Sequence, residues 1–328
     1  MSVVALRINP VLRREMVERM RGGRTFLILT LYLGLLSVVL FFSYQVGREN
    51  DDPTQAALLG RGIFEYLLFF MLLLVLFIAP GTAASAIAGE RERQTLVPLQ
   101  VTLLSPQRII LGKIYAAVAF LLLLVVATLP LLSVSYLIGG VTIGEVLGGV
   151  GTVLFVGLAV GCLSAAVSTF TRRVQGATVL SYGIVLVLLL GTLAAYGAAG
   201  MIDSSRGVDA ANPPSWLLLP NPIATISGVV GDGLNDGSMS SPFDWVEDQL
   251  IDDRSDEVFI DQDFGGGAVA FDENGNPIAP DGQPLAIDET PEIPTSFLWG
   301  SIGLLAALAA LAVGLGALRL RTPAQTER

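Results

Sequence analysis

The stretch DENGN, residues 272–276, places oxygen ligands at the spacing that calcium-binding loops use. Asp272, Asn274 and Asn276 would supply the first, third and fifth ligands of an EF-hand loop. However, Pro277 stands where that loop requires glycine, and no glutamate follows at the twelfth position. An Asn-Gly pair between short apolar runs also predicts a β-hairpin over residues 268–279, and this turn is favoured over a calcium site.

A second stretch, Gly112-Lys113, has the ending of a phosphate-binding loop. Ile114 replaces the serine or threonine that such a loop needs, and Gln107 stands in place of its leading glycine. This motif therefore does not predict ATP binding. The chain has no histidine, which excludes a Ser-His-Asp triad and an HExxH zinc site. We expect neither catalysis nor a cofactor.

The chain is too apolar to be a soluble protein. Of its 328 residues, 52% are hydrophobic and 15% are charged, and its mean hydropathy is +0.67. One soluble core cannot bury so much apolar surface. A helix needs about 20 apolar residues to cross the bilayer. Six runs meet that length, at residues 26–46, 63–87, 110–138, 145–169, 175–201 and 296–318. We predict an all-α membrane protein with six transmembrane helices.

Basic residues predict the orientation of these helices. Lys and Arg are retained on the cytoplasmic side, and 15 of the 19 fall on one side of the predicted spans. The other side has Arg48, Arg61, Arg206 and Arg254. Both termini are therefore expected in the cytoplasm. The predicted parts are a cytoplasmic amphipathic helix at 1–25, spans one to five at 26–201, an external segment at 202–294, the sixth span at 295–320 and a cytoplasmic tail at 321–328.

The external segment is acidic. It has 19 Asp or Glu against two Arg, a net charge of −17. Its first part, residues 212–231, is apolar enough to lie against the outer membrane surface, with Trp216 as an interfacial anchor. The remainder is rich in acids, Gly, Pro and Asn, which predicts a small, partly ordered domain or a disordered acidic loop.

Few charges interrupt the apolar runs. Glu65 and Glu145 lie at the outer ends of their spans, and Lys113 lies at an inner end. Each is predicted to be a boundary residue in contact with water, and the alternative is a role in the transport path. A carrier driven by protons is disfavoured, because a proton relay needs charges within the spans. The single cysteine, Cys162, is interpreted as a small packing residue.

Glycines recur at four-residue spacing around the fourth span, a pattern that lets helix backbones approach closely. They are Gly140, Gly144 and Gly148, followed by Gly157 and Gly161. Packing within the chain and dimerisation are both consistent with this pattern.

The N-terminal sequence NPVLRREMVERMRGG has the signals of one short helix. An Asn-Pro pair begins it and a Gly-Gly pair ends it. Its apolar residues gather on one face, while Arg13, Arg14 and Arg19 lie largely elsewhere. We expect this helix to lie flat on the inner leaflet, and the alternative is an ordinary basic topology signal.

Residues 88–109 form the most charged and most interrupted loop on the predicted cytoplasmic side. After the second span, residues 90–93 alternate in charge and would form a water-exposed collar. Thr95 then caps a short apolar helix, and Ser105 with Pro106 begins the third span. The short helix would present an apolar surface in the cytoplasm, and such a surface usually binds a partner.

This loop resembles that of the integral membrane subunits of type-two (ABC-2 type) ABC exporters. The family pattern reads E-x-E, then T-L-x-x-L-x-x-T-P-L-S and I-x-x-G-K. The chain matches it without a gap at Glu90, Glu92, Thr95, Leu96, Leu99, Thr102, Leu104, Ser105, Ile109, Gly112 and Lys113. It departs at Leu103, where the family often has proline, and at Pro98. The N-terminal segment, the six spans and the stretch NPIATISG are similar to the family as well.

The resemblance implies a non-catalytic permease of the cytoplasmic membrane that acts in export. It would dimerise with itself or a paralogue and bind two ABC ATPase subunits, with no nucleic-acid partner. The ATPase-coupling interface would comprise Glu90, Glu92, Thr95, Leu96, Leu99, Thr102, Leu103, Leu104 and Ser105, with the N-terminal helix, including Arg13, Arg14 and Arg19, beside it. Two other classes of function are open: an ATP-independent scaffold or receptor with an acidic external domain, and a secondary transporter.

Overall fold

The computed structural model describes residues 23–47, 53–94, 106–205, 213–230, 241–251, 270–271, 277–278 and 295–319. In this part of the chain, six helices are long and apolar enough to cross a membrane. They cover Thr25–Val46, Ala56–Glu92, Tyr115–Ile138, Ile143–Phe170, Val174–Ile202 and Thr295–Arg319. Each of the six apolar runs in the sequence falls on one of these helices, so the predicted spans are confirmed.

The helices occur in the following order along the chain. The spans are α2 (Gly23–Gly47), α3 (Pro53–Ala83) continued by α4 (Ser85–Glu92), α6 (Pro106–Ile138), α7 (Ile143–Phe170), α8 (Val174–Leu186) continued by η1 (Val187–Gly191) and α9 (Thr192–Ser205), and α12 (Thr295–Arg319). Between the last two lie η2 (Ser215–Leu218), α10 (Pro222–Val230) and α11 (Asp244–Ile251).

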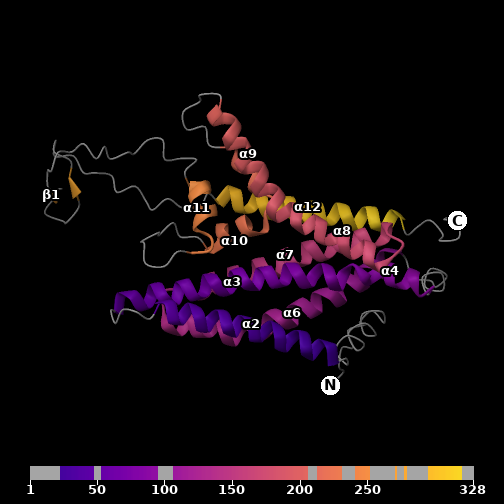
Figure 1. Cartoon of the computed structure of the whole chain (residues 1–328), viewed down its shortest axis with the longest axis horizontal. Coiled ribbons are helices and arrows are strands. Elements are labelled where there is room, and N and C mark those ends of the chain that lie inside the picture. The colour runs from indigo at the N-terminus through magenta and orange to yellow at the C-terminus, as the bar shows by residue number, and fades with distance from the viewer. Residues whose placement is uncertain are drawn as a thin grey trace, which may run out of the picture.

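The bundle has two distinct ends (Figure 1). One end, called here the α4 end, contains α4, the turn from α7 to α8 and the last turn of α12. The other, called the α10 end, contains α10, α11, the start of α3 and the turn from α6 to α7. Because successive spans alternate in direction, each end gathers residues that are far apart in the sequence.

The second span is longer than the predicted residues 63–87, since it begins at Pro53 and reaches Glu92 through α4. The prediction from hydropathy was shorter at both ends, because charged residues such as Arg61 near the start and Glu92 at the end lower the local hydropathy. Ala84 separates α3 from α4, but its backbone is helical (φ −62°, ψ −29°) and its N–H donates to the carbonyl oxygen of Pro80 at 2.8 Å, as in a continuous helix.

Helix α7 lies at the centre of the bundle and packs against α3, α6, α8, α10 and α12. Its glycines permit this close packing. A Cβ atom on Gly149 would lie 2.5 Å from Leu68 Cδ1 of α3, and one on Gly157 would lie 2.7 Å from Val75 Cγ1. Gly148 approaches a side chain of α10 in the same way. Of the recurring glycines, Gly148 and Gly157 therefore serve packing within the chain.

The turn between α6 and α7 requires glycine because of its backbone conformation and its close contact with α3. Gly139 and Gly140 have φ values of +113° and +76°, a region that residues with a Cβ atom rarely adopt. The turn lies directly against the start of α3. A Cβ atom on Gly60 would clash with the carbonyl oxygen of Gly139, and one on Gly140 would clash with that of Ala57.

Part of the segment predicted to lie on the outer membrane surface, Pro222–Val230 of residues 212–231, instead packs into the bundle as α10. Helix α10 packs against α7 and α12, and its fully buried residues are Ala224, Thr225, Ile226 and Ser227. An apolar helix has the same composition in both places, and the glycines of α7 provide the room. Trp216 of η2 is 63% exposed, so it keeps the exposure that an interfacial anchor needs.

A polar residue joins α10 to the interrupted fifth span. Asn221 is fully buried, and its Oδ1 accepts a hydrogen bond from the backbone N–H of Ile223 at 2.8 Å, which caps α10. Its Nδ2 donates to the carbonyl oxygen of Leu189 at 3.1 Å and to Thr192 Oγ1 at 2.8 Å. Leu189 belongs to η1, a single π-helical segment, and segments of this kind often mark functional positions.

The predicted hairpin is confirmed in its paired residues. Strand β1 (Ala270–Phe271) pairs antiparallel with β2 (Pro277–Ile278), with Ala270 opposite Ile278. The turn residues and the candidate calcium ligands Asp272, Asn274 and Asn276 lie outside the described residues.

Candidate functional site

Helix α4 is the last part of the second span and leads to residues 95–105, which are called here the docking segment because they are predicted to bind the ATPase. It ends at Glu92, and the backbone N–H of Arg93 donates to the carbonyl oxygen of Gly89 at 3.1 Å. Gln94 then has a φ of +58°. A left-handed residue directly after a helix turns the chain away from the helix axis. The end of α4 therefore fixes the position of Gln94, the last described residue before the docking segment.

Ser168 of α7 supplies hydrogen bonds to the start of α4. Its hydroxyl oxygen accepts from the backbone N–H groups of Ile87 at 3.0 Å and Ala88 at 2.8 Å. The residue at the cap position of α4, Ala84, has no side chain that can do this. Because backbone amides at a helix start lack partners within the helix, the hydroxyl of a second helix satisfies them. Ser168 is fully buried in this contact.

Arg91 of α4 donates hydrogen bonds to the C-terminal end of α7. One guanidinium nitrogen donates to the carbonyl oxygen of Thr171 at 2.6 Å, and the other donates to that of Thr169 at 3.2 Å. The last carbonyls of a helix also lack partners within the helix, and α7 ends at Phe170. A positive charge is favourable there because the helix dipole is negative at its C-terminus.

Glu92 of α4 caps the next helix. Its Oε1 accepts a hydrogen bond from the backbone N–H of Val174, the first residue of α8, at 2.8 Å. Arg173 occupies the cap position of α8 and makes no side-chain cap hydrogen bond. A carboxylate is the preferred group at a helix N-terminus, where the dipole is positive.

The predicted coupling residues divide into two groups. Glu90, which is half-buried, and Glu92, which is exposed, belong to α4. The other predicted residues lie outside the described part of the chain: Thr95, Leu96, Leu99, Thr102, Leu103, Leu104 and Ser105 of the docking segment, and Arg13, Arg14 and Arg19 of the N-terminal helix. The predicted water-exposed collar is wrong for Glu90 and Arg91, which are half-buried, and right for Glu92 and Arg93, which are exposed.

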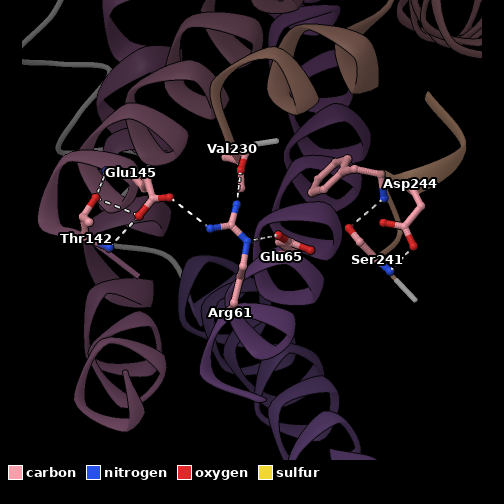
Figure 2. A network of polar contacts seen from close by, with 8 residues as sticks. Arg61, Glu65, Thr142, Glu145, Val230, Ser241 and Asp244 are labelled. Atoms are coloured by element: carbon pink, nitrogen blue, oxygen red, sulfur yellow. Dashed lines mark hydrogen bonds and ion pairs between the residues drawn. The ribbon is translucent and has the colours of Figure 1, made fainter. Parts of the chain in front are cut away.

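A cluster of charged residues lies at the α10 end (Figure 2). Arg61 of α3 donates from Nε to Glu65 at 3.0 Å and from another nitrogen to Glu145 of α7 at 3.2 Å. A third nitrogen donates to the carbonyl oxygen of Val230, the last residue of α10, at 2.5 Å. We call these four residues the Arg61 cluster. One guanidinium thus joins α3, α7 and α10.

Glu145 is held in place by the start of its own helix. Thr142 Oγ1 accepts from the backbone N–H of Glu145 at 3.3 Å, and Glu145 Oε2 accepts from the backbone N–H of Thr142 at 2.5 Å. This reciprocal pair is a capping box. It leaves the other carboxylate oxygen free to face Arg61 (Figure 2).

The prediction that Glu65 is a water-exposed boundary residue is wrong. Its exposed fraction is 6%, and Ser241 and Asp244, the first residue of α11, lie beside it (Figure 2). Sequence reasoning placed no role on Arg61. The spacing of four residues between Arg61 and Glu65 is a helical ion-pair signal that points to this pair, whereas Glu145 is 84 positions away and carries no local signal.

Cys162 is a buried free thiol, in agreement with its interpretation as a packing residue. It borders an apolar groove of about 540 Å³ between α7 and α12. The remaining walls include Phe155, Ala310 and Gly314. Within the described residues, no three His, Cys, Asp or Glu side chains are grouped so as to hold a metal ion.

Comparison with known proteins identifies one family. The model of a family described as ABC-2 family transporter protein matches residues 48–318, which include the docking segment, α4 and both sites described above. No relative matches the chain among the curated proteins.

Proposed function

Since the chain belongs to the ABC-2 family of transporter proteins, we propose that ATP hydrolysis on separate ATPase subunits drives its transport cycle through residues 88–109. The protein is a membrane permease of an ABC transporter, and it is a multi-pass protein of the cell membrane. The finer proposal is that two ATPase subunits bind a dimer of this permease, formed with itself or a paralogue, and that the permease itself hydrolyses no ATP.

The observation that carries this proposal is the position of the two helix ends that flank the docking segment. Helix α4 ends at Glu92 and α6 begins at Pro106 at the same end of the bundle. The segment matches the family pattern at Thr95, and its apolar residues match it at Leu96 and Leu99. A segment that must return within eleven residues stays close to this end of the bundle, where an ATPase subunit at the membrane surface can reach it.

The test replaces apolar residues of this segment by acids. Burying one leucine side chain contributes roughly 1.5 to 3 kcal/mol, so Leu99→Asp with Leu103→Asp should weaken ATPase binding on the order of a hundredfold. The measurement is co-purification of the ATPase with the permease. Gln94→Asp with Gln100→Asp adds the same charge without removing apolar side chains, and it should leave binding close to that of the wild type.

Retained ATPase binding by the leucine variant, at normal expression and thermal stability, contradicts the docking role. ATP hydrolysis by the purified permease alone contradicts the proposed division of labour.

We also propose that the α4 end faces the cytoplasm and the acidic segment faces outward. The support is the distribution of basic residues, which places Arg91, Arg93, Arg172, Arg173 and Arg319 at the α4 end.

The orientation is tested by labelling with an impermeant thiol reagent in a Cys162→Ser background. Cysteines introduced at Ser255 and Asn274 should react in intact cells, and one introduced at Gln94 should react after lysis alone. The reverse pattern contradicts the orientation.

A further inference from the structure

Three helix ends meet at the α4 end, and each is capped by a side chain from another element. Ser168 of α7 bonds the start of α4, Arg91 of α4 bonds the end of α7, and Glu92 of α4 bonds the start of α8. We call Ser168 to Val174 the α7–α8 corner. A helix is normally capped by a residue next to it in the sequence. Here each cap comes from another helix, so the ends of α4, α7 and α8 keep their hydrogen bonds only while these helices stay together.

The apolar contact beneath these caps is also tight. Ala84 and Ala88 of α4 and Ala177 of α8 are fully buried against one another, with Val174 packed beside them. Small side chains bring the two backbones close, and they leave no long side chain that can bend to absorb a displacement. Rotation of α4 against the corner would therefore break the caps and open this contact.

From this arrangement we propose that Arg91, Glu92 and Ser168 transmit the movement of the docking segment to the fourth and fifth spans. The inference rests on the proposed function, because it requires that an ATPase moves residues 95–105. The covalent chain joins that segment directly to α4 and α6. The exchanged caps connect α4 to α7 and α8 at this end of the bundle, in addition to the packing of α7 against α3 and α6. The three residues act as positioning residues and do not themselves contact the ATPase.

Glu92 distinguishes this inference from the role that the family resemblance implies. If Glu92 forms an ion pair with the ATPase, its charge is essential. If it caps α8, an acceptor oxygen in the same place is sufficient. Glu92→Gln keeps the acceptor and loses the charge, whereas Glu92→Ala loses both. The two variants therefore separate a docking role from a capping role.

The experiment uses the complete transporter, the permease with its co-purified ATPase in lipid. Spin labels are attached to cysteines introduced at Gly176 of α8 and Tyr115 of α6 in a Cys162→Ser background. Both positions are exposed, and a Cβ atom at Gly176 has no neighbour within 4 Å. ATP with vanadate should change the distance between the labels in the parent protein.

The expected result is that Glu92→Ala retains its ATPase but loses about fivefold in the population with the changed distance, the factor that one ordinary hydrogen bond carries. Glu92→Gln should behave like the parent. Ser168→Ala should show a similar loss, although its fully buried position prevents contact with the ATPase.

Three results overturn the inference. The first is a normal distance change in Glu92→Ala. The second is loss of ATPase from both Glu92→Ala and Glu92→Gln, which assigns Glu92 to docking and leaves the proposed function intact. The third is a parent permease that binds no ATPase, which removes the proposed function together with the inference.

Discussion

Replacement of Arg61 by methionine tests the cohesion of the α10 end. Arg61 makes three polar contacts, to Glu65, Glu145 and the carbonyl oxygen of Val230. The variant leaves two carboxylates without their cation in a site where the side chains of Glu65 and Glu145 are 8% and 19% exposed. Breaking a buried ion pair by removing one partner costs about 3 to 5 kcal/mol.

The partial exposure of Glu145 favours the lower limit, because water screens that pair. We therefore expect Arg61→Met to lower the free energy of unfolding by about 3 kcal/mol, on the order of a hundredfold in the folding equilibrium. The assay is unfolding by SDS in mixed micelles, followed by circular dichroism.

Two controls define the cause. Arg93→Met removes an exposed arginine at the α4 end and should change stability by less than about 0.5 kcal/mol. Combining Arg61→Met with Glu65→Gln and Glu145→Gln removes the uncompensated charges and should recover most of the loss. A loss below about 0.5 kcal/mol in Arg61→Met, or no recovery in the triple variant, refutes the reasoning, since exposed pairs contribute no more than this.

Two further substitutions probe the packing of the spans by the same unfolding assay. Gly60→Ala places a methyl group against the carbonyl oxygen of Gly139 and should lower the free energy of unfolding by about 1 to 3 kcal/mol. The control is Gly34→Ala, whose added Cβ has no atom within 4 Å and should stabilise its helix by up to about 1 kcal/mol. Equal effects of the two variants would contradict the close approach of Gly60 to Gly139. Asn221→Leu removes the acceptor that caps α10 and both donors to the fifth span, so a loss of about 3 kcal/mol is expected, and a loss below about 1 kcal/mol would contradict the bridging role.

The spans were predictable because hydropathy over about 20 residues depends on composition alone. The same averaging misplaced the start of the second span, since Arg61 lowers the local hydropathy although its charge is paired with Glu65 in the fold. Glycine spacing predicted close helix contacts, and the partner helices of Gly148 and Gly157 were decided by the three-dimensional arrangement.

The sites themselves were less predictable, because their partners are distant in the sequence. Ser168 lies 80 positions from Ala88, and Glu92 lies 82 positions from Val174. By sequence pattern, a serine in an apolar helix and a glutamate at the end of one are both ordinary boundary residues, so neither indicates a partner in another helix. The burial of α10 was missed for a related reason, since hydropathy does not distinguish a helix on the membrane surface from one packed between spans.

The positions of the polar contacts explain why a movement at α4 should reach the whole length of α7. Ser168 ties α7 to α4 at one end, and Glu145 ties it to α3 through Arg61 at the other. Between these ties, Gly149 and Gly157 bring α7 against α3 over several turns. Sliding of one helix along the other would break polar contacts at both ends and separate close-packed surfaces in between. If the proposed function is right, we therefore expect a push on α4 to tilt α3 and α7 together, and we expect α8 to follow because Glu92 holds its first turn.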